Sequence, residues 1–133
     1  MKYLLDASAL VNIVKRGELF KLYDAVTLDL ALYEALNAIW KEHFQLRKID
    51  KDTAIEFITI FQRIFNVIDK MSVEELEREV FETSCKYGLT IYDASYVTVA
   101  VKNSCILITD DERLTGKIGG VLKVKSSREI RPV

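Results

Sequence analysis

The chain has 133 residues, a length typical of one domain, and half of them are hydrophobic. Charged residues make up 29% of the sequence, and 19 Lys and Arg residues nearly balance 20 Asp and Glu residues, for a net charge of −1. These values exclude a disordered chain and an overall basic field that would attract nucleic acid. We therefore expect a single globular domain over residues 1–133.

Hydrophobic residues do not gather into any long run. The longest unbroken apolar stretches, 30–33 and 105–108, have four residues each, whereas a membrane span needs about 20 and a signal-peptide core at least about 7. We therefore expect a soluble, cytoplasmic protein without membrane contact. Cys85 and Cys105 lie in apolar segments without metal-ligand spacing, so we expect two buried, reduced thiols.

Strand and helix patterns alternate along the chain. The first half of the chain predicts a strand at 1–5, a helix at 7–16 ending at Gly17, a strand at 25–28, and helices at 30–48 and 53–66. A helix at 72–87 follows, opened by a Ser72–Glu75 capping box and ended by Gly88. The rest predicts a helix at 91–103 capped by Thr90, a strand at 105–109, a short helix to about 117 and a strand at 121–124. Short apolar strands alternating with helices predict an α/β fold with a central parallel sheet and helices on both faces.

Acidic residues follow two of the predicted strands directly. Asp6 comes after the first strand, and Asp110 and Asp111 come after the strand at 105–109. In open parallel sheets, ligands bind beyond the carboxyl ends of the strands. Each aspartate also has a simpler interpretation, because Asp is a favoured helix N-cap.

Asp93 lies on the apolar side of a predicted helix. Its neighbours at helical spacing include Tyr96 and Val97, so its carboxylate must be paired, hydrogen-bonded or bound to a metal. The alternative is a capping box, because Asp93 comes three residues after Thr90.

Glu34 begins a polar stripe at helical spacing, continued by Asn37, Lys41, Gln45 and Lys48. The stripe can be a solvated helix face. It can instead line a groove, in which Glu34 helps to hold a metal and Lys41 and Lys48 contact phosphates. The sequence alone leaves both interpretations open.

Carboxylates without a His or Cys cluster select a hard cation such as Mg²⁺ or Mn²⁺ rather than zinc. Such an ion polarises a phosphoryl oxygen and activates water, and its charge allows a chain of net charge −1 to bind an anionic polymer. Residues 112–133 add a local net charge of +4 from six basic and two acidic residues. Phosphate-binding loops of the GxxxxGKS or GxGxxG type and a GxSxG elbow are absent from the sequence.

The chain resembles the PIN domain family, and within it the VapC-type ribonuclease toxins. The resemblance extends over the whole chain and rests on an ordered set of motifs: Leu5-Asp6-Ala7-Ser8, Glu34, Tyr92-Asp93-Ala94-Ser95-Tyr96 and Ile108-Thr109-Asp110-Asp111. It implies a three-layer α/β/α sandwich and a metal-dependent endoribonuclease. By position, the acids that hold Mg²⁺ or Mn²⁺ are Asp6, Glu34, Asp93 and Asp111.

The resemblance also implies supporting residues and partners. Ser8 and Thr109 match positions whose hydroxyls orient the acids, and Asp110 leaves open which of two adjacent aspartates faces the metal. The expected partners are an RNA substrate, a second copy in a homodimer, and an antitoxin that inserts a basic side chain among the acids. We expect that antitoxin to pack on an apolar patch of the helices at 30–40 and 53–65, formed by Trp40, Phe57 and Phe61.

Three other functions remain alternatives. A stand-alone RNA-processing nuclease would use the same acids without an antitoxin, and a non-catalytic PIN-like module would only bind. A phospho-receiver would share the parallel sheet, but it requires an acidic pair after the first strand, where this chain has Asp6 alone. A short upstream reading frame with a DNA-binding head would favour the toxin over the stand-alone nuclease.

Overall fold

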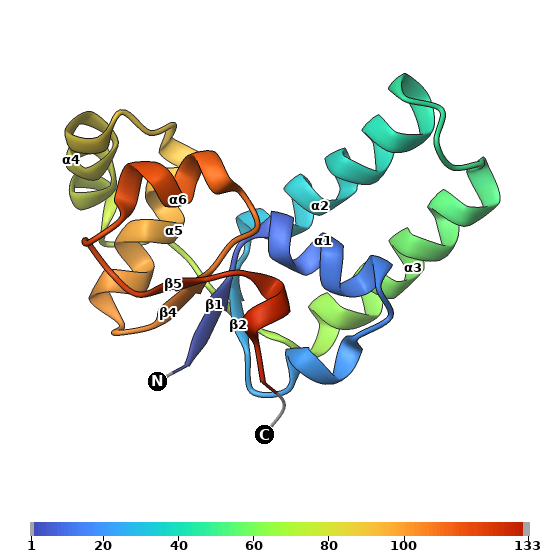
Figure 1. Ribbon diagram of the computed structural model, residues 1–133, viewed down its shortest axis with the longest axis horizontal. Helices are drawn as coiled ribbons and strands as arrows, with labels where there is room; N and C mark the ends of the chain where they lie inside the picture. The colour runs from blue at the N-terminus through green and yellow to red at the C-terminus, as the bar shows by residue number, and fades with distance from the viewer. Residues whose placement is uncertain (1, 132–133) are drawn as a thin grey trace.

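The computed structural model describes residues 2–131, which form a three-layer α/β/α sandwich (Figure 1). Five parallel strands make one sheet in the order β3-β2-β1-β4-β5. They are β1 (Tyr3–Leu5), β2 (Val26–Leu28), β3 (Asp69–Met71), β4 (Ile106–Ile108) and β5 (Val124–Lys125). The helices are α1 (Ala7–Lys15), α2 (Leu30–Trp40), α3 (Lys51–Val67), α4 (Glu77–Tyr87), α5 (Ile91–Lys102) and α6 (Glu112–Ile118). The predicted fold class is confirmed.

Strands β1 and β4 form the centre of the sheet. Figure 1 shows α1, α2 and α3 on one side of the strands and α4, α5 and α6 on the other. Both faces are thus covered, and Leu4, Leu5, Leu107 and Ile108 are completely buried. Because β1 pairs with both β2 and β4, the strand order changes direction between β1 and β4. The carboxyl ends of these two strands therefore flank the usual ligand position of such sheets.

Most predicted elements are present with small shifts at their ends. Gly17 and Gly88 follow α1 and α4 with φ values of 70° and 65°, a left-handed conformation that glycine adopts without strain. Thr90 caps α5 by accepting a hydrogen bond from the Asp93 amide at 3.2 Å. Met1, part of the predicted first strand, lies outside the described residues.

The helix predicted over 30–48 is interrupted. Its α-helical part ends at Trp40, and a π-helical turn, Lys41–Gln45, follows. Arg47 then has φ 50°, which a continuing helix does not allow. Lys48 therefore lies in a loop rather than on the helix face. Helices α2 and α3 extend together beyond the sheet as a two-helix arm, joined by this turn (Figure 1).

The capping box predicted at Ser72 and Glu75 is wrong. Ser72 accepts a hydrogen bond from the Glu74 amide within a turn, and Glu75 has φ 72°, so α4 begins only at Glu77. Strand β3 just before it was not predicted, because its side chains are mostly polar and exposed. It is an edge strand held by backbone pairing to β2.

Two smaller expectations also need correction. The last strand is Val124–Lys125 rather than 121–124, because Leu122 forms only an isolated bridge with Gly119. Cys105 is buried, as expected, but Cys85 is exposed, because α4 buries only Val80. None of the helices within residues 2–131 combines the length and hydrophobicity needed to cross a bilayer.

Candidate active site

Asp6 is both a helix cap and a buried carboxylate at the end of β1. Its Oδ1 atom accepts hydrogen bonds from the Ser8 hydroxyl at 2.7 Å and the Ala9 amide at 3.0 Å. The residue is 5% exposed. Burial raises the pKa of Asp6 to about 6, although the neighbouring hydroxyls of Thr109 and Ser8 work against this shift. Asp6 can therefore cap α1 and also belong to a polar site.

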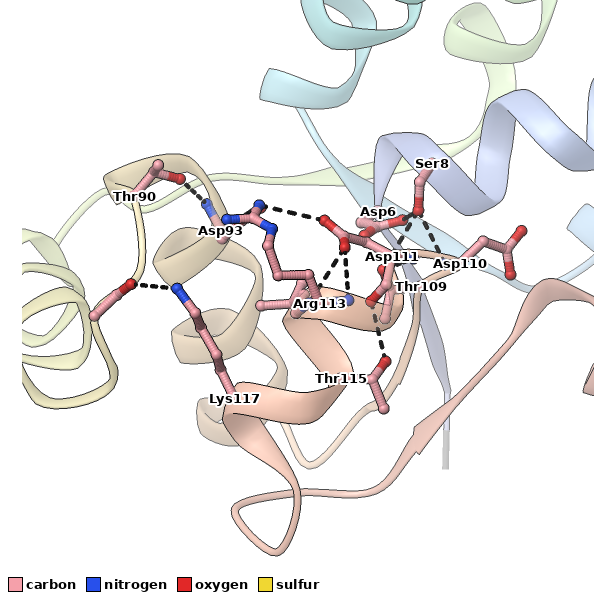
Figure 2. Close-up of polar contacts among 12 residues, drawn as sticks. Asp6, Ser8, Thr90, Asp93, Thr109, Asp110, Asp111, Arg113, Thr115 and Lys117 are labelled. Carbon is pink, nitrogen blue, oxygen red and sulfur yellow. Dashed lines mark hydrogen bonds and ion pairs between the residues drawn. The ribbon is translucent and has the colours of Figure 1, made fainter.

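Hydroxyl groups join the ends of β1 and β4. Ser8 Oγ lies 3.3 Å from Thr109 Oγ1 and accepts a hydrogen bond from the Asp110 amide at 3.0 Å. Thr109 Oγ1 in turn accepts from the Asp111 amide at 3.1 Å (Figure 2). The two hydroxyls thereby hold Asp6 next to the turn that carries the later aspartates.

Asp110 and Asp111 point in different directions (Figure 2). Asp110 Oδ1 accepts from the Ser127 amide at 2.7 Å, and its Oδ2 accepts from Asn12 Nδ2 at 2.8 Å and from the Ser127 hydroxyl. Burial opposes ionisation of Asp110, but these hydrogen bonds outweigh it and lower the pKa. Asp110 thus anchors the C-terminal turn to α1. Asp111 caps α6 through the amides of Arg113 and Leu114.

The other two acids lie on helices: Glu34 on α2 and Asp93 in the first turn of α5. Burial and the charge of Asp111 raise the pKa of Asp93, against the effect of nearby Arg113 and Lys117. Burial also raises the pKa of Glu34, and the charge of Asp93 adds to the shift. Glu34 Oε1 accepts a hydrogen bond of 2.7 Å from the hydroxyl of Tyr96.

Tyr96 and Arg113 are polar partners of the acids that the sequence analysis did not assign. Tyr96 belongs to the Tyr-Asp-Ala-Ser-Tyr motif, and it is 1% exposed. Burial and the charge of Glu34 raise its pKa, so it remains a hydrogen-bond donor at neutral pH. The sequence signal that could have identified Tyr96 was its position one helical turn after Asp93, on the same side of α5. No local pattern pointed to Arg113.

The carboxylates of Asp6, Glu34, Asp93 and Asp111 form a row, in the sense that the charge of each acts on its neighbour. The charge of Glu34 raises the pKa of Asp6, that of Asp93 acts on Glu34, and that of Asp111 acts on Asp93. Over residues 2–131, however, no three His, Cys, Asp or Glu side chains come together as a ready-made metal site. The assignment of Asp6, Glu34, Asp93 and Asp111 as metal ligands therefore stays a prediction.

The chemistry of this row fits a hard divalent cation. All four groups offer carboxylate oxygens, the ligand type that Mg²⁺ and Mn²⁺ prefer. The pKa values of Asp6, Glu34 and Asp93 are raised by burial and by the neighbouring carboxylates. A bound cation would relieve this excess of negative charge.

Two grooves flank Asn12 and Asp110. One of about 370 Å³ is lined by Ser8, Glu34, Asn37 and Lys41 among others. The first half of the polar stripe therefore lines a groove, whereas Lys48 lies outside it. The other groove, of about 800 Å³, was not predicted, and its basic residues are Lys15, Arg16, Lys125 and Arg128. The excess of basic residues over 112–133 was its only signal in the sequence.

The family is decided by a comparison with known domains. A family model described as PIN domain matches residues 3–117. The chain belongs to the PIN domain family. Membership confirms the resemblance seen in the motifs, and it leaves the phospho-receiver alternative without support.

Relatives of this PIN domain include two proteins of Pyrobaculum aerophilum. One, named exonuclease VapC9, is 33% identical over 128 residues, covering 95% of this chain and 92% of the relative. The other, named ribonuclease VapC3, is 32% identical over 125 residues, covering 88% and 95%.

Two solved structures share the fold. The crystal structure of PAE2754 from Pyrobaculum aerophilum superimposes with a TM-score of 0.76 at 28% identity, covering 96% of this chain and 85% of that one. The DNA-bound VapBC structure from Salmonella typhimurium has a TM-score of 0.66 at 11% identity, covering 96% and 98%, and this likeness concerns the fold alone.

The adjacent aspartates of this PIN domain should differ in their effect on stability. Asp110→Asn replaces one acceptor oxygen by a donor that faces Asn12 and Ser127, so the free energy of unfolding should fall by about 1–3 kcal/mol. Asp111→Asn keeps the Oδ1 atom that caps α6 and should cost less than about 1 kcal/mol. Urea unfolding of both variants measures the difference. Equal losses would contradict the different roles of the two side chains.

The buried carboxyl of Asp6 should make the metal-free protein more stable in mild acid. Its pKa of about 6 exceeds the ordinary value of 3.8, so between these values the folded state binds a proton that the unfolded chain has lost. The contribution of Asp6 to the free energy of unfolding therefore rises as pH falls through about 6, by roughly 2 kcal/mol between pH 7.5 and 4.5. Denaturation in EDTA from pH 7.5 to 4.5 should show a flatter response for Asp6→Asn.

A matched control is Asp50, which caps α3. A hydrogen bond from the Thr53 amide lowers the pKa of Asp50. Its stabilising contribution is present above its ordinary pKa of 3.8 and is lost only as pH falls through the lowered value, the opposite sign to that of Asp6. Between pH 7.5 and 4.5 this contribution is constant, so Asp50→Asn should run parallel to wild type there. An Asp6→Asn profile that runs parallel to wild type would contradict the raised pKa.

Proposed function

We propose that this PIN domain is a metal-dependent endoribonuclease in which Asp6, Glu34, Asp93 and Asp111 hold Mg²⁺ or Mn²⁺. One observation carries the proposal: Glu34 on α2 and Asp93 on α5 lie close enough to the acids that follow β1 and β4 for neighbouring charge, with burial, to raise the pKa values of Asp6, Glu34 and Asp93. Helix capping alone would not require the charge of each acid to act on the next. The relatives named exonuclease VapC9 and ribonuclease VapC3 support nuclease chemistry.

The residues around the proposed metal site would have different roles in RNA hydrolysis. The ion, when bound, would polarise a phosphoryl oxygen and make a water molecule acidic enough to act as the nucleophile. Ser8 and Thr109 position Asp6, and the Tyr96 hydroxyl positions Glu34. Lys41 lines the groove next to Glu34 and is placed to contact an RNA phosphate. Lys48 is exposed beyond the π-helical turn, so its RNA contact would lie farther along the arm.

A second candidate activity is exonucleolytic cleavage, because one relative is named an exonuclease. A circular RNA has no ends, so only an endonuclease cuts it.

Cleavage of circular single-stranded RNA should require Mg²⁺ or Mn²⁺ and should stop in EDTA. Asp93→Asn should lower the rate by about 100-fold, the size of effect expected for losing one charge-stabilising group. Asp93→Asn should also be at least as stable as wild type without metal, because its raised pKa shows that the fold disfavours the ionised form. Product gels and thermal melts in EDTA provide the measurements.

Three results would contradict this proposal. Cleavage that survives the chelator would exclude a metal mechanism. An Asp93→Asn variant with a clearly lower melting temperature would favour a purely structural role for Asp93 at the start of α5. Cleavage of linear but not circular RNA would assign the exonuclease activity instead.

We further propose that the protein is the toxin of a toxin–antitoxin pair and works as a homodimer. Support for the toxin assignment comes from the relatives named VapC and from the fold shared with a VapBC structure. A small antitoxin would insert an Arg or Lys among the carboxylates, since a guanidinium binds carboxylates in place of a metal. The stand-alone RNA-processing nuclease and the non-catalytic module remain the alternatives.

The arm formed by α2 and α3 offers an apolar surface for this partner. Trp40 and Phe44 stack at 5.4 Å between ring centroids and are 46% and 62% exposed. The patch differs from the one predicted, because Phe61 is completely buried and Phe57 is half-buried. Helix α3 turns these rings toward the core, so the aromatic patch consists of Trp40 at the end of α2 and Phe44 in the π-helical turn.

Co-expression with the small protein encoded upstream should yield a stable complex without RNase activity. Phe44→Ala should weaken that complex, since it removes part of the exposed aromatic stack. Phe81→Ala is the matched control, because Phe81 is 61% exposed on α4, on the other side of the sheet. Pull-down and size-exclusion chromatography measure complex formation. No stable complex, or inhibition that survives replacement of the antitoxin's basic residues by Ala, would shift the assignment to a stand-alone nuclease.

A further inference from the structure

Arg113 lies between two of the four acids. A single guanidinium nitrogen, Nη2, is 3.6 Å from Asp93 Oδ2 and 3.6 Å from Asp111 Oδ2 (Figure 2). The two carboxylates come from different elements, the first turn of α5 and the turn after β4. One cation therefore joins groups that would otherwise repel each other.

The contacts of Arg113 divide between its backbone and its side chain. Its backbone amide donates to Asp111 Oδ1 at 3.0 Å, and the Leu114 amide donates to the same oxygen at 3.2 Å. Only Oδ2 faces the guanidinium. Departure of the side chain would thus free one oxygen of Asp111 and leave the carboxylate in place.

The guanidinium occupies the position that a metal on these two acids would require. A divalent ion held by Asp93 and Asp111 would take the place of the guanidinium nitrogen that now lies within 3.6 Å of both carboxylates. The Arg113 side chain is 65% exposed, and exposed ion pairs are weak. It can therefore move into solvent when an ion arrives.

We propose that Arg113 is a positioning residue that acts as a built-in counter-cation and exchanges with the divalent ion. Before the ion binds, Arg113 holds Asp93 and Asp111 together against their repulsion. When the ion binds, Arg113 leaves both carboxylates. The inference rests on the metal site of the proposed function and concerns the exchange of cations at that site.

Removing Arg113 should therefore have opposite effects on stability and on metal binding. Without the guanidinium, Asp93 and Asp111 face each other uncompensated, so the metal-free protein should melt at a lower temperature. The ion no longer has a competitor, so Mn²⁺ should bind Arg113→Gln about fivefold more tightly, the factor corresponding to one exposed ion pair. A residue with only a structural role would not strengthen metal binding.

The experiment measures Mn²⁺ affinity by electron paramagnetic resonance and calorimetry, together with thermal melts in EDTA. Arg113→Lys keeps the charge and should stay close to wild type in both measurements. Lys117→Gln is the matched control: Lys117 also lowers the pKa of Asp93 through its charge, but its ammonium group donates to the Gly88 carbonyl oxygen and does not lie between the acids. Its effect on Mn²⁺ affinity should be clearly smaller than that of Arg113→Gln.

The outcomes separate this inference from the proposed function. Equal Mn²⁺ affinities of wild type and Arg113→Gln, or weaker binding by the variant, would overturn the exchange while leaving the metal site intact. An equal gain in Mn²⁺ affinity for Lys117→Gln would mean that loss of any nearby positive charge strengthens binding, and this would also overturn the exchange. If neither wild type nor Arg113→Gln binds Mn²⁺, the exchange and the metal mechanism both fail. Should Arg113→Gln not fold, Mn²⁺ binding by Arg113→Lys much weaker than wild type would count against the exchange.

Discussion

The hydroxyl contact between Ser8 and Thr109 joins the carboxyl ends of β1 and β4, and the polar site is organised around it. Ser8 donates to Asp6 and accepts from the Asp110 amide, and Thr109 accepts from the Asp111 amide. The Ser8–Thr109 contact and the bond from the Asp110 amide to Ser8 connect segments about a hundred positions apart in the chain. They can form only because β1 and β4 are neighbours in the sheet. The parallel pairing of two buried strands thus places the acids.

Repulsion between carboxylates is the second constraint on this edge of the sheet. The acids are partly or wholly buried, and the charge of one disfavours ionisation of the next. The chain balances part of this charge with Arg113, whereas Asp6 and Glu34 rely on neutral hydroxyl donors. The same unbalanced charge would attract a divalent ion or a basic side chain from a partner. The metal binding, the counter-cation role of Arg113 and the antitoxin inhibition that we propose would all follow from this one electrostatic arrangement.

Local patterns predicted most of the fold because its central strands and helices are chemically distinct. The buried strands β1, β2 and β4 are apolar, and the glycines after α1 and α4 mark where these helices end. The pattern failed where a tertiary contact decides the structure. Strand β3 is polar and exists through pairing with β2, and the helix after Trp40 changes to a π-helical turn at the end of the arm. The capping box at Ser72 failed because the same spacing also occurs in turns.

The sequence by itself determined the family, the parallel α/β architecture and the identity of the candidate acids, because apolar strands followed by aspartates are local and ordered along the chain. Only the tertiary structure decided how these acids divide their roles. It separates Asp110, which anchors the C-terminal turn through Ser127, from Asp111, which turns toward Asp93. It also brings Tyr96 to Glu34 and Arg113 to Asp93 and Asp111. Hydrogen bonds and ion pairs depend on distance in space, and helix packing on the sheet sets those distances.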